Sequence, residues 1–272
     1  MSKVAIITGA GRGIGRAVAE RLAADGWAVA LAARTTAELH ATADQITANG
    51  GVALAIPTDV TDAAAVRELV ERATAELGVP TALVNIAGAL GPFGQFYELD
   101  LAQVRPMVDA IWWGTLHTCH AVLPGLIERG GGSIVNIAGY GAADPSPRLA
   151  AYGAIKAALV RFTESLAAET KRAKIRANVI GPGLVITRLS TEIASTAEAT
   201  RFADGMVKMA NTKGVPASEA AELVAFLLSD ESAPLTGRFL TVHDDYRALA
   251  AQAAQINTGN AYTLRRLTQS TF

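Results

Sequence analysis

The chain has 272 residues, of which 50% are hydrophobic and 18% charged, and its formal net charge is -1 at pH 7. A chain of this kind can bury a large core, and its balanced charge gives no overall field that attracts nucleic acid or an acidic membrane surface. Its single cysteine, Cys119, excludes an internal disulfide, which suits a reducing cytosol.

The N-terminal stretch MSKVAIITGAG lacks the basic region and the cleavage site of a signal peptide. No apolar run reaches the length needed to span a bilayer. We therefore expect a cytoplasmic protein with neither a membrane nor nucleic acid among its partners.

Short apolar segments alternate along the chain with longer segments of helical spacing. The predicted strands are Val4–Thr8, Ala28–Ala32, Val52–Pro57, Ala82–Asn85, Ser133–Ile137, Ile175–Ile180 and Arg238–Val242. The predicted helices are Ile14–Ala24, Thr36–Ala48, Ala63–Leu77, Leu101–Leu126, Ala150–Ala173 and Ala217–Leu228. Strands without polar alternation indicate a sheet covered on both faces, and the strict alternation predicts one α/β domain with a doubly wound parallel sheet.

Two segments differ from this pattern. Ser190–Gly214 follows a strand's carboxyl end, where ligands bind in such folds, and is interpreted either as a lid or as a surface insertion. Residues 244–272 form a tail whose first half is helical by composition. We expect this tail to pack on the domain, taken as residues 1–243, or on a neighbouring subunit.

A glycine-rich turn, TGAGRGIG, joins the first predicted strand to the first predicted helix. Glycines allow the backbone to approach a diphosphate, which the helix N-terminus then stabilises. A purely structural turn would not need four glycines in seven residues. The sequence therefore predicts a nucleotide site whose contacts are Gly9, Gly11, Arg12, Gly13, Ile14 and Gly15.

The second predicted strand ends in Ala33-Arg34, where a carboxylate would hydrogen-bond the adenosine ribose and repel a 2′-phosphate. Arg34, helped by Arg12, is able to pair with that phosphate, so NADP(H) is favoured over NAD(H). Two solvated arginines are the alternative. Asp59-Val60 follows the third strand and is placed to meet the adenine edge, although Asp59 could equally be a helix N-cap.

Tyr152 and Lys156 are four residues apart in a predicted helix and share one of its faces. A lone Tyr-x-x-x-Lys is weak evidence for a site, but this one lies downstream of a nucleotide turn. The stretch VNIAG also occurs twice, as LVNIAG from Leu83 and IVNIAG from Ile134, each time at the end of a predicted strand.

In order and spacing, TGAGRGIG, Asp59-Val60, LVNIAG, YGAIK and PGLVIT resemble the short-chain dehydrogenase/reductase family over about residues 3–243. The resemblance implies a Rossmann-type sheet of about seven strands, a homodimer or homotetramer, and hydride transfer between NAD(P) and a small or medium carbonyl or alcohol. Tyr152 would move the proton, and Lys156 would hold the nicotinamide ribose. The remaining cofactor contacts it implies are Asn85, Ala87, Gly88, Pro182, Gly183, Val185 and Thr187.

Two positions depart from the family pattern. The family's serine, thirteen residues before the tyrosine, is replaced by Gly139, and an asparagine three residues before a glycine is replaced by Ile111. Losing one oxyanion donor costs roughly 10²–10³ in rate without abolishing hydride transfer. Tyr140 and Ser146 are candidate substitute donors, although either could be a plain loop or pocket residue.

We therefore expect an NADP(H)-dependent oxidoreductase. The alternative is a degenerate member that keeps the cofactor as a regulatory or binding module, or that does lyase or isomerase chemistry. His117 and His120 lie near Cys119 on one predicted helix, but without a carboxylate partner they do not indicate a metal site, and none is expected.

Overall fold

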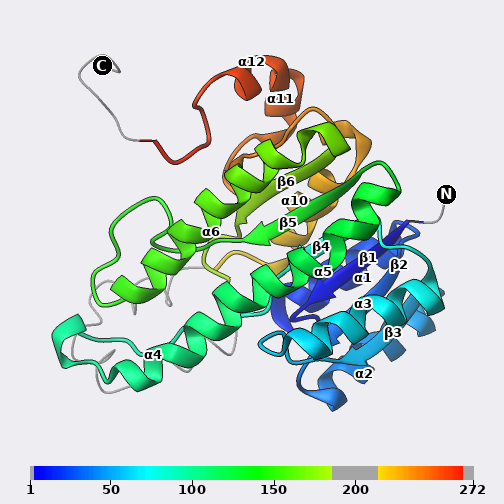
Figure 1. Cartoon of the computed structure of the whole chain (residues 1–272), viewed down its shortest axis with the longest axis horizontal. Helices are drawn as coiled ribbons and strands as arrows, with labels where there is room; N and C mark the ends of the chain where they lie inside the picture. Colours follow the sequence, from blue (N-terminus) through cyan, green and yellow to red (C-terminus); the bar gives the residue numbers. More distant parts are fainter. Residues whose placement is uncertain (1–2, 186–213, 266–272) are drawn as a thin grey trace.

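The computed structural model of the chain describes residues 3–185 and 214–265, which fold around one parallel sheet (Figure 1). In these residues seven strands pair in the order β3-β2-β1-β4-β5-β6-β7. They are β1 Val4–Thr8, β2 Ala28–Ala33, β3 Val52–Pro57, β4 Ala82–Asn85, β5 Gly132–Ile137, β6 Ile175–Gly181 and β7 Phe239–Thr241. The predicted doubly wound sheet is confirmed, and its strand order reverses between β1 and β4.

Helices cover both faces of the sheet (Figure 1). On one face pack α1 (Gly13–Ala24), α2 (Thr36–Ala48) and α10 (Ala217–Leu228), and on the other pack α3 (Ala63–Leu77), α5 (Gly114–Glu128) and α6 (Ala150–Glu169). Neighbouring strand residues enter opposite layers: Ile7 joins the first and Ile6 the second. Because both layers are apolar, the strands read as unbroken hydrophobic runs.

The predicted helix Leu101–Leu126 is not one continuous α-helix. It consists of α4 (Leu101–Val108), a π-helical turn at Asp109–Trp113, and α5, which continues to Glu128. A π-helical turn shifts the hydrogen bonds to the fifth residue within an otherwise helical pattern. Sequence periodicity does not reveal it, so the prediction of a single helix was wrong at this point.

The predicted helix Ala150–Ala173 was also too long. α6 ends at Glu169, and Lys171–Ala173 form a 3-10 turn. The chain leaves this turn through Lys174, whose φ of 57° lies in the left-handed region. A left-handed residue at this place ends the helix and directs the chain into β6.

The tail after β7 packs on the domain as far as it is described. It forms α11 (Tyr246–Ala251) and α12 (Ala253–Thr258), and Ala253 and Ile256 are buried in the layer that contains α10. The ring of Tyr246 lies 4.9 Å from that of Phe226, between centroids.

The tail then returns across the edge of the sheet. Arg238 donates hydrogen bonds to the carbonyls of Gly259 and Ala261 at 3.2 and 3.0 Å. The amide of Phe239, in the edge strand β7, donates to the carbonyl of Tyr262 at 2.8 Å. The tail therefore covers part of this edge. None of the helices in the described ranges is both long and apolar enough to cross a bilayer.

Candidate active site

The reversal of strand order brings the carboxyl ends of β1 and β4 side by side. Thr8 ends β1, and its hydroxyl accepts hydrogen bonds from the amides of Ile86 at 3.0 Å and Ala87 at 3.1 Å. These contacts hold the segment after β4 against the glycine turn after β1. In doubly wound folds this crevice is where dinucleotides bind.

The glycine turn has the shape of a diphosphate cradle. A Cβ on Gly15 would come within 2.1 Å of the carbonyl oxygen of Gly9, and one on Gly9 would come within 2.9 Å of the amide of Ala87. Side chains are therefore excluded where the turn, α1 and the β4 end meet. Arg12 at the N-cap of α1 makes no capping bond with its side chain. The first amides of α1 thus fit an anion such as a diphosphate.

The two predicted phosphate-binding arginines both have acidic neighbours. Arg12 Nη1 lies 3.7 Å from Glu38 Oε1 at the surface. Asp59 accepts hydrogen bonds from the amide and hydroxyl of Thr61 at 2.9 and 2.8 Å. Partial burial alone would raise the pKa of Asp59, but these bonds and the positive charge of Arg34 outweigh it and hold that pKa below its ordinary value. Arg34 and Asp59 are thus neighbours beside the predicted adenosine site.

Val60, predicted to flank the adenine, is buried against α5. A Cβ on Gly114 would come within 2.6 Å of its side chain. Nδ1 of His117 lies 3.0 Å from its carbonyl oxygen, a hydrogen bond in the tautomer that carries the proton there. His117 therefore has a structural contact, while His120 is exposed. In the residues described, no group of three potential metal ligands comes together.

The two VNIAG stretches meet through their asparagines. Asn85 pairs with Asn136 in the β4–β5 register, and its amide donates to the Asn136 carbonyl oxygen at 2.9 Å. Asn136 donates in turn to the Thr163 hydroxyl in α6 at 2.8 Å, and Thr118 in α5 donates to Asn85 at 2.7 Å. All four side chains are buried. This network ties two strand ends to two helices directly below the predicted site.

Tyr152 and Lys156 lie on the face of α6 that meets the end of β5. Nζ of Lys156 donates to the carbonyl of Ile137 at 2.8 Å and lies 5.6 Å from the centre of the Tyr152 ring. Burial lowers the pKa of Lys156 from 10.5 to about 8 and raises that of Tyr152 from 10.0 to about 12. At neutral pH the lysine is therefore mostly charged and the tyrosine keeps its proton.

Gly139 adjoins the hydroxyl of Tyr152. A Cβ built on Gly139 would lie 2.9 Å from that hydroxyl oxygen and 3.9 Å from Cε of Lys156. The position predicted to carry the family's serine is thus next to both candidate catalytic groups, and here it has no side chain.

Ile111 lies in the π-helical turn and is buried, in a cluster with Met107 and Leu159. A Cβ on Gly88 would come within 3.1 Å of Cγ1 of Ile111. The position predicted to carry the family's asparagine therefore presents an apolar side chain to the segment after β4.

Tyr140 and Ser146 lie in the loop that follows Gly139, and they differ in their surroundings. The side chain of Tyr140 is exposed. The Ser146 hydroxyl is buried, and a Cβ on Gly141 or Gly153 would come within 2.3 or 2.4 Å of it. Its hydrogen bond, at 3.5 Å, is to the carbonyl of Leu149. Ser146 thus fills the space between its own loop and α6.

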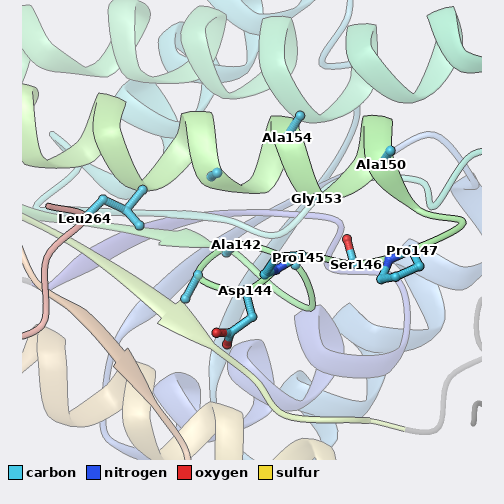
Figure 2. Close-up of a pocket in the computed structure, with 12 residues that line it drawn as sticks. Ala142, Asp144, Pro145, Ser146, Pro147, Ala150, Gly153, Ala154 and Leu264 are labelled. Atoms are coloured by element: carbon cyan, nitrogen blue, oxygen red, sulfur yellow. The ribbon is translucent and has the colours of Figure 1, made fainter. Parts of the chain in front are cut away.

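The same loop lines a cavity of about 580 Å³ on the other side of α6 (Figure 2). Figure 2 shows the loop with Pro145 and Ser146 running beside α6, which contributes Ala150, Gly153 and Ala154 to the lining, with Leu264 of the tail at one end. Residues three and four apart share one helix face, which here is the face turned away from Tyr152 and Lys156. This cavity is therefore separate from the two groups, although one loop borders both.

All four predicted nicotinamide contacts follow β6, and three of them lie within the described residues. Pro182 and Val185 are buried, and a Cβ on Gly183 would come within 2.8 Å of Val215. Val185 pairs with Val215 in an isolated parallel bridge. Thr187 and the predicted lid, except Gly214, lie outside the described residues.

Comparisons with known proteins identify the family to which this chain belongs. Residues 3–198 match the family model described as short chain dehydrogenase. The chain belongs to the short-chain dehydrogenase family. It is 33% identical over 247 residues to 2,3-dihydro-2,3-dihydroxybenzoate dehydrogenase of Bacillus subtilis, a match that covers 88% of this chain and 94% of the relative.

Solved structures in the family have the same fold. A 3-ketoacyl-ACP reductase from Sinorhizobium meliloti is 33% identical, with a TM-score of 0.79 over 88% of this chain and 96% of that one. Actinorhodin polyketide ketoreductase with NADPH is 31% identical, with a TM-score of 0.81 over 89% and 95%. This chain is thus similar to oxidoreductases that include reductases, and members of its family bind NAD(P)(H).

Sequence reasoning missed the threonines that organise the site. Thr8, Thr118 and Thr163 accept or donate the hydrogen bonds that fix the two strand ends. Thr8 was predicted only as the end of a strand and the start of the glycine turn, and the other two only as helix residues. The signal available was a polar side chain within each otherwise apolar buried stretch, since such groups are normally hydrogen-bonded.

Proposed function

We propose that the chain is an NADP(H)-dependent oxidoreductase that interconverts a carbonyl and an alcohol on a small or medium organic substrate. The observation that carries this is the joint placement of Tyr152 and Lys156 at the end of β5, on the same sheet edge as the diphosphate cradle. When bound, NADPH supplies the hydride for the carbonyl carbon. The groups of this chain bind, orient and move the proton.

Tyr152 is the proton donor in the direction of reduction. Its hydroxyl keeps its proton at neutral pH because burial raises its pKa to about 12. As negative charge develops on the substrate oxygen, the proton moves from the Tyr152 oxygen to it, and the nearby Lys156 ammonium stabilises the tyrosinate that remains. In the direction of oxidation the tyrosinate takes the proton back.

Replacing Tyr152 by Phe tests this role because it removes only the hydroxyl. General acid catalysis is worth about 10²–10⁴ in rate, so ketone or aldehyde reduction should fall by that factor. NADPH binding, followed by nucleotide fluorescence, should stay within about twofold of the wild type. A wild-type protein that binds NADPH but shows no Tyr152-dependent turnover across a broad carbonyl panel would contradict the proposal.

The preference for NADP(H) rests on Arg34 and Arg12 at the adenosine side. A hydrogen bond to a charged group is worth about 1.5–3 kcal/mol, so Arg34→Leu should weaken NADPH binding roughly 10- to 100-fold and leave NADH binding almost unchanged. Arg67→Leu, at an exposed arginine of α3, is the matched control. Equal losses for both nucleotides would show that Arg34 does not read the 2′-phosphate.

Two neighbouring positions favour a second candidate, a member of the fold that keeps the cofactor without redox turnover. Gly139 offers no hydroxyl beside Tyr152, and Ile111 is apolar where a polar relay is predicted. If Gly139→Ser raised carbonyl reduction by orders of magnitude over a barely active parent, the degenerate candidate would be favoured. A neutral or harmful effect on an active parent would exclude it.

We also propose a homodimer or homotetramer in the cytoplasm. Exposed apolar side chains support self-association: Leu101 begins α4, Trp113 ends the π-helical turn, and Ile127 lies near the end of α5. Light scattering of the purified protein decides between one, two and four copies.

A further inference from the structure

The substrate oxygen in the proposed reaction needs a second hydrogen-bond donor beside Tyr152. The Cβ direction of Gly139 points at the Tyr152 hydroxyl, with 2.9 Å between that hydroxyl and the Cβ position. Because residue 139 is a glycine, it supplies no side-chain donor, which leaves the backbone that follows it.

Gly139 begins a tight turn. The amide of Ala142 donates to the carbonyl of Gly139 at 3.1 Å, and Gly141, the third residue of the turn, has a φ of 82°. Tyr140, the second residue, has no positive φ. These values define a type II β-turn with glycine where that turn requires it.

The turn fixes the direction of one amide. The Gly139–Tyr140 peptide is trans, so its N–H points opposite to its C=O. Because that carbonyl is directed into the turn toward Ala142, the Tyr140 N–H is directed out of it. In residues 3–185 and 214–265 this N–H meets no hydrogen-bond acceptor.

The amide is also within reach of the reacting oxygen. Covalent geometry puts the nitrogen of Tyr140 about 3 Å from the Cβ position of Gly139, and hence at most about 6 Å from the Tyr152 hydroxyl. One substrate oxygen can accept hydrogen bonds of about 2.8 Å from two donors that lie up to about 5.6 Å apart. The lack of a side chain on Gly139 leaves this space open.

We propose that the main-chain N–H of Tyr140 donates a hydrogen bond to the substrate carbonyl oxygen, in the role that a serine hydroxyl at residue 139 would have. This rests on the proposed function. The N–H transfers no proton; it stabilises the negative charge that the oxygen gains when hydride adds to the carbonyl carbon, until Tyr152 protonates that oxygen. The two candidate side-chain donors are less suited. The Ser146 hydroxyl is enclosed by Gly141 and Gly153, and the Tyr140 side chain is exposed.

The turn permits a direct test, because proline is favoured at the second position of a type II turn and has no N–H. Tyr140→Pro removes the amide hydrogen and the side chain, whereas the matched control Tyr140→Ala removes the side chain only. We expect kcat/KM for ketone reduction to be about 10²–10³-fold lower in the proline variant than in the alanine variant. NADPH dissociation constants and thermal midpoints should agree between the two.

A serine should rescue the loss. In Gly139→Ser/Tyr140→Pro the hydroxyl replaces the missing N–H. The new Cβ lies 2.9 Å from the Tyr152 hydroxyl oxygen at a backbone φ of 158°, so the Tyr152 hydroxyl has to shift and the serine backbone is strained. The double variant should then recover to within about tenfold of Tyr140→Ala, given that one donor is worth 10²–10³ in rate. Rescue by the serine supports the inference, and equal activity of the proline and alanine variants overturns it.

Gly139→Ser alone gives a second test if the proline variant does not fold. With a donor already present, the serine should raise kcat/KM by less than about tenfold, and a gain of 10² or more contradicts the inference. Wild-type protein without Tyr152-dependent turnover overturns the proposed function and this inference together. Tyr152-dependent turnover with equal proline and alanine variants overturns the inference alone.

Discussion

Burial moves the titrations of Lys156 and Tyr152 in opposite directions. Lys156 has its pKa lowered from 10.5 to about 8, so between these values the unfolded chain binds more protons than the folded one. The contribution of this lysine to the free energy of unfolding therefore increases as the pH rises from 8 to 10.5. Tyr152 keeps its proton up to about 12 when folded and loses it near 10.0 when unfolded, so its contribution falls as pH rises through that window.

Lys156→Met isolates the lysine contribution. Below pH 8 the folded wild type carries the cost of a buried ammonium, about 3 kcal/mol, and this cost disappears by pH 10.5. The free energy of unfolding of the variant minus that of the wild type should therefore be larger at pH 7 than at pH 10, by about that amount. Urea denaturation at both pH values measures it.

The control for that measurement is Lys171→Met at an exposed lysine. Its difference from the wild type should be the same at both pH values. A constant difference for Lys156→Met as well would show that the folded protein does not penalise the charged lysine.

We expect the buried side chain of Ile111 to stabilise the fold, whereas the family's usual asparagine at this position would supply a polar group. Ile111→Asn would bury an amide beside Met107 and Gly88, and an unpaired buried polar group costs about 1–3 kcal/mol. Val79→Asn, at an exposed position between α3 and β4, should change the free energy of unfolding by less than about 0.5 kcal/mol. Equal effects in urea denaturation would mean that residue 111 is not enclosed as described.

Elements are joined at the site by the network that passes through Asn136. It is the member that connects β4 to α6, because it accepts from Asn85 and donates to Thr163. This amide therefore links both strand ends to α6, while the Thr118–Asn85 bond links β4 to α5. Small shifts of β5 would move the Ile137 carbonyl that holds Lys156.

Asn136→Ala leaves the Asn85 amide and the Thr163 hydroxyl with fewer partners in a buried place. The free energy of unfolding should fall by about 2–4 kcal/mol in urea denaturation. Asn49→Ala, at the exposed end of α2, should stay within about 0.5 kcal/mol of the wild type. A loss at Asn136 no larger than at Asn49 would contradict the description of a connected network.

Most elements could be predicted from the sequence because parallel strands buried on both faces leave an unmistakable apolar pattern. The glycine turn was also predictable, since only glycine fits where Gly15 meets Gly9. The π-helical turn at Asp109–Trp113 was not predictable, because its residue composition does not differ from that of an ordinary α-helix. The partners of Arg238 were not either, since Gly259 and Ala261 act through backbone carbonyls that any residue supplies.

At the scale of the whole molecule, the tail is fastened to the sheet and to α6. Arg238 donates to two tail carbonyls, and Glu164 accepts from Leu264 N at 2.7 Å and from Arg265 at 2.9 Å. Residues 244–265 thus belong to the folded unit through these polar contacts as well as through the apolar packing of α11 and α12. We expect them to open before the sheet does.

Arg238→Met should loosen the tail without unfolding the domain. Hydrogen bonds to a charged group are worth about 1.5–3 kcal/mol, so local opening should make proteolysis after residue 243 roughly 10- to 100-fold faster. Mass spectrometry of the fragments locates the cut. Arg67→Met is the control, and similar cleavage rates in both variants would show that Arg238 does not hold the tail.

Cys119 gives the molecule a practical property. Its thiol is buried below the site, 3.5 Å from the Asn85 amide, and burial raises its pKa to about 12 despite that contact. A thiol that stays protonated and enclosed reacts poorly with maleimides and disulfide reagents. A cysteine introduced at the exposed Ala143 would therefore be the single labelling position on the native protein. A fluorophore there would report on the turn after Gly139 with the native cysteine left in place.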